Sequence, residues 1–405
     1  MNDAYGNLIS SLAKPNDKRI VLLVMDGVGD CDNAGRGTAL HLARTPNLDA
    51  LSRRSALGEH MPVGPAVTPG SGPGHLGLFG YDPLVYQVGR GVLGALGIEF
   101  PLTPRDVAAR LNFCTLDADG NVTDRRAGRI NDAENRRVLD KVRAGLKPPD
   151  GVEVIFETEA EHRALLVLRG DGLDADVGET DPQATGVPPL DAARPPHAQS
   201  RTAAAFKAVE AQVRDLLKAE PKANMILARG FAKVPDWPTF ADRWQLKPGA
   251  IAGYPMYRGV ARLVGMPVLA QPTTAADICA AVAGALQEDY TFLFAHFKYT
   301  DKTGEDGDLD GKIARIEEMD AALPALLDAG PDVLVVTGDH STPPSLRGHS
   351  WHPVPLLLHG PSLRGGDGPR FCETACRRGQ LGRILAREIV PLALAHAGKL
   401  DKFGA

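Results

Sequence analysis

The chain has 405 residues, of which 43% are apolar and 23% charged, a composition usual for a folded protein of two or three domains. Its 45 basic and 50 acidic side chains give a formal charge of −5, which argues against a nucleic-acid binder. The five cysteines are unevenly spaced and predict no disulfide framework. The N-terminus lacks the apolar core of a signal peptide, and no apolar run is long enough to span a bilayer. We therefore expect a soluble, cytoplasmic protein without a nucleic-acid or membrane partner.

Four short apolar runs predict strands that are buried on both faces, as in a parallel sheet. They are residues 19–25, 290–297, 332–337 and 354–358. Helical patterns lie at 41–56, 311–328 and 379–397. Strands that alternate with helices indicate an α/β sheet.

The middle of the chain has a different pattern, with short predicted strands and one long predicted helix. The strands are at 152–157, 164–168 and 225–228, and the helix is at 201–219. The loop 170–200 is long for a connection, and such loops often act as lids. We predict an inserted α+β domain at 105–245, between the two parts of a catalytic domain formed by 1–104 and 246–405.

Acidic and imidazole side chains follow the predicted strands at their carboxyl ends, where open α/β sheets bind ligands. They are Asp26, Asp301, Glu305, Asp339 and His340, with His349 just before the fourth strand. Taken singly, an Asp in such a place is usually a turn former or a helix cap, and a His is more often structural. Together they predict a site for divalent metal ions, Mn²⁺ or Mg²⁺ first and Zn²⁺ as a further possibility. Two such ions are a common device for phosphoryl transfer.

Ser71 lies between Gly70 and Gly72, just before a predicted short helix. Glycine neighbours let backbone N–H groups approach an anion, and a helix N-terminus favours negative charge. A hydroxyl beside a divalent cation loses its proton more easily, so Ser71 is a candidate nucleophile. The alternative role for Ser71 is that of a helix N-cap. The nucleophile elbow G-x-S-x-G does not fit because positions 69 and 73 are proline, and the chain has no P-loop.

Collinear segments along nearly the whole chain resemble the archaeal-type cofactor-independent (2,3-bisphosphoglycerate-independent) phosphoglycerate mutases of the alkaline phosphatase superfamily. Among them are VLLVMDGVGD (21–30), TPGSGPGHLGLFGYDP (68–83), DRRAGRI (124–130), HFKYTDKTGEDGD (296–308) and TGDHSTP (337–343). The resemblance implies an α/β fold with an alkaline-phosphatase-like, mostly parallel sheet sandwiched by helices and an inserted α+β cap domain. It also implies a two-metal isomerase of glycolysis and gluconeogenesis that interconverts 3-phosphoglycerate and 2-phosphoglycerate through a phosphoserine.

The resemblance assigns roles by position, with Ser71 as the nucleophile. The residues that match the ligands of one metal are Asp26, Ser71, Asp339 and His340. Those that match the ligands of the other are Asp301, Glu305 and His349. The family has His where this chain has Glu305. A carboxylate still binds Mn²⁺ or Mg²⁺, so Glu305 is kept as a ligand, and the metal preference and pH dependence stay open. Trp351-His352 also departs from the archaeal pattern.

A phosphoglycerate carries a carboxylate and a phosphate, so it needs cationic partners. The candidate substrate-binding residues are Arg126, Arg129, Arg163, Arg229 and Lys298, with Asp124 as a candidate for orienting the glycerate hydroxyls or for acid–base work. His75, one helical turn after Ser71, is as well explained by packing as by chemistry.

Two alternatives to a mutase stay open. The first is a metal-dependent phosphatase or phosphotransferase of the same superfamily that acts on another small phosphorylated metabolite, an alternative that Glu305 motivates. The second is a non-catalytic sensor, against which the presence of Ser71 argues. In a mutase, the inserted domain would close over the phosphoserine and exclude water. The sequence does not determine the oligomeric state.

Overall fold

The computed structural model describes residues 3–404, which divide into two compact units. The second unit comprises residues 88–236, and the first is built from the chain on either side of it. The predicted insertion, 105–245, therefore has different boundaries. Helix α5 (Arg90–Gly97) joins the second unit because it packs against that unit's strands β3 (Asp106–Leu116) and β7 (Met225–Ala232). Helix α8 (Phe240–Trp244) joins the first, where the Trp244 indole donates a 3.0 Å hydrogen bond to the Phe79 carbonyl.

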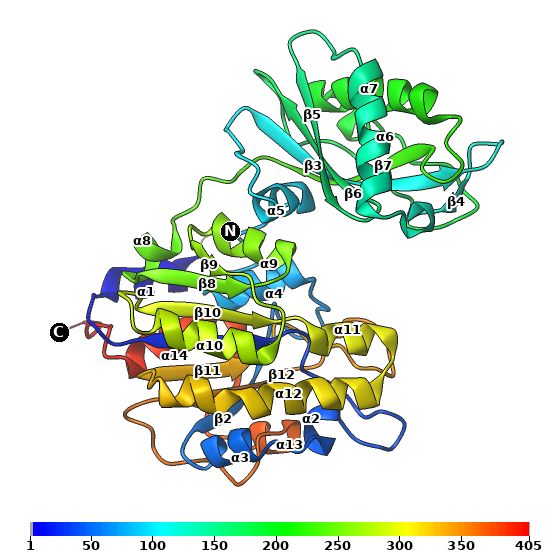
Figure 1. Ribbon diagram of the computed structural model, residues 1–405. Helices are drawn as coiled ribbons and strands as arrows, with labels where there is room; N and C mark the ends of the chain where they lie inside the picture. Colours follow the sequence, from blue (N-terminus) through cyan, green and yellow to red (C-terminus); the bar gives the residue numbers. More distant parts are fainter. Residues whose placement is uncertain (1–2, 405) are drawn as a thin grey trace. The chain divides into compact units, whose positions relative to one another are not determined.

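The described part of the first unit contains an eight-stranded sheet (Figure 1). In spatial order its strands are β13 (Gly382–Leu385), β2 (Ala56–Met61), β12 (Val354–His359), β11 (Val333–Thr337), β1 (Ile20–Met25), β10 (Phe292–Phe297), β8 (Pro248–Ala252) and β9 (Val268–Ala270). Strand β12 pairs antiparallel with both neighbours, and the other pairings are parallel. The predicted α/β class with a mostly parallel sheet is thus confirmed.

Helices cover both faces of this sheet, which explains why every residue of β1 is buried. The helices that share one apolar core with the sheet are α2 (Ala39–Leu42), α3 (Pro46–Ser52), α10 (Ala275–Ala285), α12 (Leu309–Asp328) and α13 (Glu373–Cys376). On the opposite face lie α4 (Ser71–Leu78), α8 and α9 (Pro255–Leu263). Phe79, at the end of α4, packs against Phe294 of β10 at a ring-centroid distance of 4.9 Å, and Phe240 of α8 packs against Phe292. The unit also contains α1 (Ala4–Leu12), α11 (Tyr299–Asp306) and α14 (Ile389–His396).

Two predicted helices of this unit are wrong in part. The segment 41–56 is interrupted at residues 43–45, because Pro46 disfavours a helical conformation in the residue before it. The last residue of this segment, Ala56, is the first residue of strand β2. In the segment 379–397, residues 382–385 form the edge strand β13, which pairs with β2, and α14 starts only at Ile389. The four predicted strands and the helix at 311–328 are confirmed within two residues.

The second unit has a five-stranded antiparallel sheet. Strand β3 is its centre, flanked by β7 and by β6 (Arg163–Arg169), with β5 (Glu153–Ala160) beyond β6 and the short β4 (Val122–Asp124) beside β3. Helices α6 (Asp132–Gly145) and α7 (Arg201–Leu217) pack on one face through a core that includes Phe206 and Val209. The predicted strands and helix of this region are confirmed, and β3 is a strand that the sequence pattern did not indicate.

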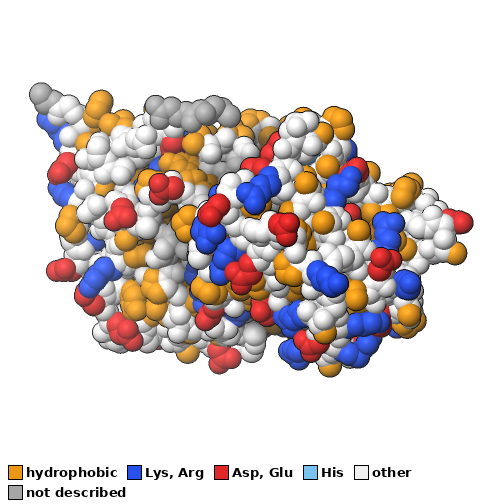
Figure 2. Space-filling view, turned by 90° about the horizontal axis from the view of Figure 1, so that it is seen from above, with side chains coloured by type: hydrophobic (Ala, Val, Ile, Leu, Met, Phe, Trp, Pro, Cys, Tyr) orange, Lys and Arg blue, Asp and Glu red, His pale blue; other side chains and the backbone are white. Residues whose placement is uncertain are grey.

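Surface features agree with the composition. In the view of Figure 2, Lys and Arg side chains alternate with Asp and Glu side chains instead of forming one continuous basic area. All five cysteines are free. Among the described residues, no helix combines the length and apolarity needed to cross a membrane.

Candidate metal centre

Three adjacent parallel strands deliver the predicted ligands to one edge of the sheet. Strand β1 lies between β10 and β11, in parallel register with both. Asp26 follows β1, Asp301 lies in the first turn of α11 after β10, and Asp339 and His340 follow β11. Because the strands are neighbours and point the same way, residues more than 300 positions apart in the chain come together.

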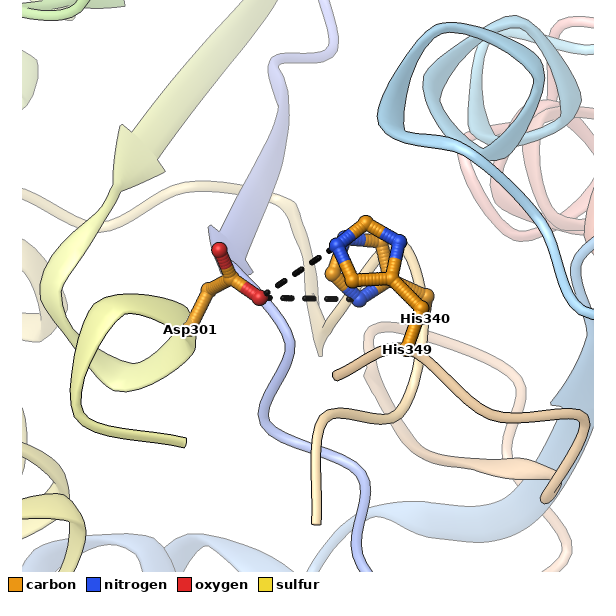
Figure 3. A group of neighbouring side chains, drawn as sticks. All are labelled: Asp301, His340 and His349. Carbon is orange, nitrogen blue, oxygen red and sulfur yellow. Dashed lines mark ion pairs between the residues drawn. The ribbon is translucent and has the colours of Figure 1, made fainter. Parts of the chain in front are cut away.

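The ligand atoms of five predicted residues form two groups, each within 4.8 Å. One group is Asp301, His340 and His349, and the other is Asp26, Asp339 and His340. Figure 3 shows the first group, in which the carboxylate of Asp301 points toward the two imidazoles. The rings of His340 and His349 stack with centroids 3.6 Å apart. His340 thus takes part in both groups.

The second group has buried polar atoms that need a cation. Nε2 of His340 lies 3.1 Å from Oδ2 of Asp339 and 3.4 Å from Oδ1 of Asp26. None of these three atoms has a hydrogen-bond partner among the described residues, and the three side chains are fully buried. Unpaired buried carboxylate oxygens are costly. Two carboxylates and an imidazole are a ligand set that fits a divalent ion.

The tautomer of His340 follows from a short hydrogen-bond chain. The hydroxyl of Thr342 lies 2.6 Å from Oδ1 of Asp301 and 3.0 Å from Nδ1 of His340. A carboxylate only accepts, so Thr342 donates to Asp301 and Nδ1–H of His340 donates to Thr342. The lone pair of His340 is then on Nε2, which faces Asp26 and Asp339. Burial lowers the pKa of His340, and the neighbouring carboxylates act in the opposite direction.

The backbone just before Ser71 orients the ring of His349. Its Nδ1 lies 2.9 Å from the Pro69 carbonyl, so Nδ1–H donates and Nε2 faces Oδ1 of Asp301 at 3.6 Å. Such a hydrogen bond from the second ring nitrogen is typical of metal-binding histidines.

Both carboxylates of the buried group are held ionised. Burial alone would raise the pKa of Asp26, but Lys298, His296 and His340 together hold this pKa well below its usual range. Burial and the charge of Asp26 act to raise the pKa of Asp339, and His340 and His75 outweigh them, so this pKa is also lowered. Deprotonated carboxylates are the form that binds a cation.

Lys298 is a cation already present in the centre. Its Nζ lies 3.0 Å from Oδ2 of Asp26 and also donates to Asp301. Burial would lower the pKa of Lys298, but the two carboxylates raise it above its ordinary value. The ammonium therefore bridges the two groups of ligands.

The predicted short helix is present as α4, but it begins with Ser71 itself, and its N-cap is Gly70, so Ser71 is not the N-cap. This helix contacts Asp339. Nδ1 of His75 lies 2.8 Å from the Ser71 carbonyl and 3.2 Å from Oδ2 of Asp339. A Cβ on Gly74 would come within 2.6 Å of the Asp339 carbonyl oxygen. The first turn of α4 therefore packs on the Asp339 backbone, and His75, left open by the sequence, contacts a predicted ligand.

Glu305 lies outside both groups of converging ligand atoms. It is exposed, one helical turn after Asp301 on α11. Partial burial and the Asp301 carboxylate raise its pKa, whereas Lys298 and His349 act to lower it. Glu305 thus responds to the charges of the first group without forming part of it.

Two residues that the sequence did not single out shape the loops of the centre. Gly27 has φ of +61°, and a Cβ there would lie 2.4 Å from the Thr342 hydroxyl, so this position needs glycine. The fully buried ammonium of Lys312 donates to the carbonyls of Gly27, Gly29 and Thr342 at 2.9–3.0 Å. It ties the loop after β1 to the loop after β11. A lysine on the mostly apolar buried face of α12, which also carries Asp320, is the sequence signal for this role.

In the second unit, arginines share the sheet face that α6 and α7 leave uncovered. On β3, Arg110 lies opposite Arg229 of β7, and Asn112 lies opposite Arg163 of β6. Arg110 and Asn112 are two positions apart on one strand, so Arg110, Arg229 and Arg163 point to the same face of the sheet. The positive charge of these arginines acts on the buried imidazole of His162. Burial, followed by the charges of the surrounding arginines, lowers its pKa to about 4. Those arginines are Arg163, Arg110, Arg126 and Arg129.

The arginine cluster therefore includes four of the predicted substrate-binding residues, with Arg110 as an addition. Arg229 lies 3.4 Å from Oε2 of Glu179, which offsets part of its charge. Asp124 accepts from the backbone N–H groups of Arg126 and Gly128, at 2.8 and 2.6 Å. Its carboxylate thus shapes the turn that presents Arg126 and Arg129. Lys298 is the predicted substrate-binding residue that lies in the first unit.

Comparison with known proteins adds independent findings. A family model described as the metalloenzyme superfamily matches residues 18–396. A probable 2,3-bisphosphoglycerate-independent phosphoglycerate mutase of Thermus thermophilus is 49% identical over 402 residues, covering 98% of this chain and 99% of that protein. A protein with the same description from Aquifex aeolicus is 46% identical over 98% of this chain and 100% of its own length.

Solved structures agree with these relatives. A cofactor-independent phosphoglycerate mutase from Thermoplasma acidophilum superposes with a TM-score of 0.70 at 29% identity, covering 94% of this chain and all of that one. A protein from Pyrococcus horikoshii superposes with a TM-score of 0.81, also at 29% identity, over 96% of this chain and all of that one.

Proposed function

The chain belongs to the 2,3-bisphosphoglycerate-independent phosphoglycerate mutases, within the metalloenzyme superfamily, and from this membership we propose how it acts. It is an isomerase that transfers a phosphoryl group within one molecule. We propose that it interconverts 3-phosphoglycerate and 2-phosphoglycerate through a phosphoserine at Ser71, with two divalent cations. A role in glycolysis would place it in the cytoplasm.

One observation carries the proposal. Three buried ligand atoms without hydrogen-bond partners converge beside the helix turn that begins with Ser71. A binding protein would not need a serine there, whereas a phosphotransferase needs a nucleophile next to its cations.

The donor set indicates which residues would hold the cations. Asp26, Asp339 and His340 would bind one, together with the Ser71 hydroxyl. Asp301 and His349 would bind the other, and Glu305 would turn toward it. When bound, the cations lower the pKa of the serine hydroxyl and offset the charge of the phosphoryl oxygens. The predominance of carboxylates favours Mn²⁺ or Mg²⁺ over Zn²⁺.

The reaction needs two displacements at phosphorus. The Ser71 hydroxyl gives up its proton and its oxygen bonds to phosphorus, while the bond from phosphorus to the glycerate oxygen breaks and that oxygen takes up a proton. After the glycerate reorients, its other hydroxyl gives up its proton and attacks the phosphoserine, and the Ser71 oxygen leaves and takes up a proton. Lys298, which touches two of the carboxylates, is placed to neutralise a phosphoryl oxygen.

The second unit would hold the glycerate during reorientation. Arg126, Arg129 and Arg163 offer planar donors suited to carboxylate and phosphate, and Asp124 shapes the turn that carries Arg126 and Arg129. Retention of the glycerate and exclusion of water separate a mutase from a phosphatase. We propose that this unit closes over the metal centre during each turnover.

Phosphorus NMR of the purified protein with 3-phosphoglycerate and Mn²⁺ tests the function. We expect 2-phosphoglycerate to appear without added bisphosphoglycerate, and activity to disappear with a chelator and return with Mn²⁺. Free phosphate that accumulates faster than 2-phosphoglycerate would contradict the mutase and favour a phosphatase. No turnover of any phosphorylated metabolite would favour a sensor.

A further inference from the structure

The two carboxylate oxygens of Asp26 have different surroundings. Oδ2 accepts a hydrogen bond from the Tyr257 hydroxyl and lies 3.0 Å from Nζ of Lys298. Oδ1 has no hydrogen-bond partner among the described residues and lies 3.4 Å from Nε2 of His340. Oδ2 is thus bound by side chains of the protein, whereas Oδ1 points toward the predicted cation.

The direction of the hydrogen bond from Tyr257 is fixed by its neighbours. Lys298 lies 3.2 Å from the Tyr257 hydroxyl oxygen. Lysine only donates, so this oxygen accepts from Lys298, and the tyrosine proton is directed to Asp26.

The ring of Tyr257 is also held in place. Tyr257 is on helix α9, fully buried, and stacks on His296 with centroids 3.7 Å apart and planes 26° apart. The centroid of the His75 ring lies 4.8 Å from the centroid of the Tyr257 ring. A ring packed in this way cannot swing aside, so the hydroxyl stays at Oδ2.

We propose that Tyr257 is a positioning residue of the metal centre, which holds Oδ2 of Asp26 so that Asp26 binds its cation through Oδ1 alone. This inference rests on the metal centre of the proposed function. The torsion that orients a carboxylate is broad, so an unrestrained Asp26 would lose this orientation. Residues that orient metal ligands typically change metal affinity 10–100-fold when they are replaced.

The test is Tyr257→Phe, which removes the hydroxyl and keeps the stacked ring. Calorimetric titration with Mn²⁺, without substrate, measures each cation site. We expect binding of one Mn²⁺ to weaken about 10-fold or more and binding of the other to change less than about 2-fold. Tyr81→Phe is the matched control: Tyr81 is equally buried, and its hydroxyl donates a 2.8 Å hydrogen bond to the Pro238 carbonyl, away from the ligands. This control should bind Mn²⁺ like the wild type.

Equal Mn²⁺ affinity in Tyr257→Phe and the wild type would overturn the positioning role. Equal losses in Tyr257→Phe and Tyr81→Phe would overturn it too, because the effect would then follow any lost buried hydrogen bond. The titration contains no substrate, so its result is independent of the mutase assay. A protein that fails to isomerise 3-phosphoglycerate but loses Mn²⁺ affinity in Tyr257→Phe would contradict the proposed function and support this inference.

A measurement on the wild type keeps the test open if Tyr257→Phe does not fold. Saturation with Mg²⁺ draws charge from Asp26 and weakens its hydrogen bond from Tyr257, so the near-ultraviolet absorption of a buried tyrosine should shift. The same shift should persist in Tyr81→Phe. Mg²⁺ binding without any tyrosine difference spectrum would count against the inference.

Discussion

The ammonium nitrogen of Lys298 lies 3.0 Å from Oδ2 of Asp26, so a protein cation occupies the space between the ligand groups. It also donates to Asp301. Without metal, this lysine offsets the repulsion between the carboxylates, and with metal it competes for them.

We therefore expect Lys298→Met to be less stable without metal and to gain more from it. The rise in Tm on adding Mn²⁺ should exceed that of the wild type, while kcat for the mutase reaction falls. Lys302→Met, an exposed lysine on the same helix, is the control and should behave like the wild type in both respects. A smaller Mn²⁺-dependent rise in Lys298→Met would refute this view of the lysine.

Replacement of the proposed nucleophile separates binding from chemistry. In Ser71→Ala, we expect kcat to fall about 1,000-fold or more, because no other hydroxyl begins helix α4. Phosphoryl transfer from labelled substrate to the protein should disappear as well. Ser11→Ala, which alters an exposed hydroxyl on α1, is the control and should retain both. Unchanged turnover in Ser71→Ala would exclude a phosphoserine at this position.

The exposed carboxylate of Glu305 should tune the choice of metal. Glu305→His replaces a hard oxygen ligand by imidazole, so we expect binding of Zn²⁺ to strengthen relative to Mg²⁺. Glu305→Gln should weaken Mn²⁺ binding about 10-fold if the side chain turns toward Asp301 when the cation is present. Asp306→Asn, the next residue on the same helix, should leave both affinities unchanged. Identical metal titrations for all three variants would show that Glu305 is not a metal ligand.

The arginine cluster makes a prediction about substrate binding. Arg163→Lys keeps the charge and loses the planar pair of donors, so KM for 3-phosphoglycerate should rise about 10-fold. Arg169→Lys, on the same strand, is the control, because Arg169 is bonded to Asp106 and should affect stability more than KM. An unchanged KM in Arg163→Lys would show that the substrate does not bind at Arg163.

Acid should destabilise the metal-free protein through His60. Its Nε2 lies 3.0 Å from the Thr337 hydroxyl and from the Gly338 carbonyl, and full burial lowers its pKa from 6.5 to about 4. The unfolded chain binds the proton first, so stability is complete above the unfolded pKa and is lost as pH falls toward the folded one. From pH 7 to pH 5, the unfolding free energy should drop by about 2 kcal/mol from this group. In His60→Gln, urea unfolding should show a smaller drop over this interval; an unaltered pH dependence would contradict the assignment.

The local pattern of the sequence determined the elements that carry the site. The continuous apolar runs before Asp26 and Asp339 could only be strands covered on both faces, and Gly70-Ser71-Gly72 could only open a helix or a turn. These features depend on residues next to one another, so they can be inferred without the fold. The collinear motifs then pointed to the family, which the relatives confirm.

Tertiary structure alone decided which atoms meet. The edge strand β13 exists only because β2 pairs with it, although its sequence was expected to be helical. Tyr257 and Lys312 come from helices without any motif. Helix α9 packs on β8, β9 and α4, and from there Tyr257 reaches Asp26, while Lys312 of α12 reaches the loop after β1. Glu305, which follows Asp301 by one turn, lies outside the converging ligands. Local sequence specifies backbone conformation, whereas the side-chain contacts of a site depend on strand order and helix packing, which arise from interactions between distant residues.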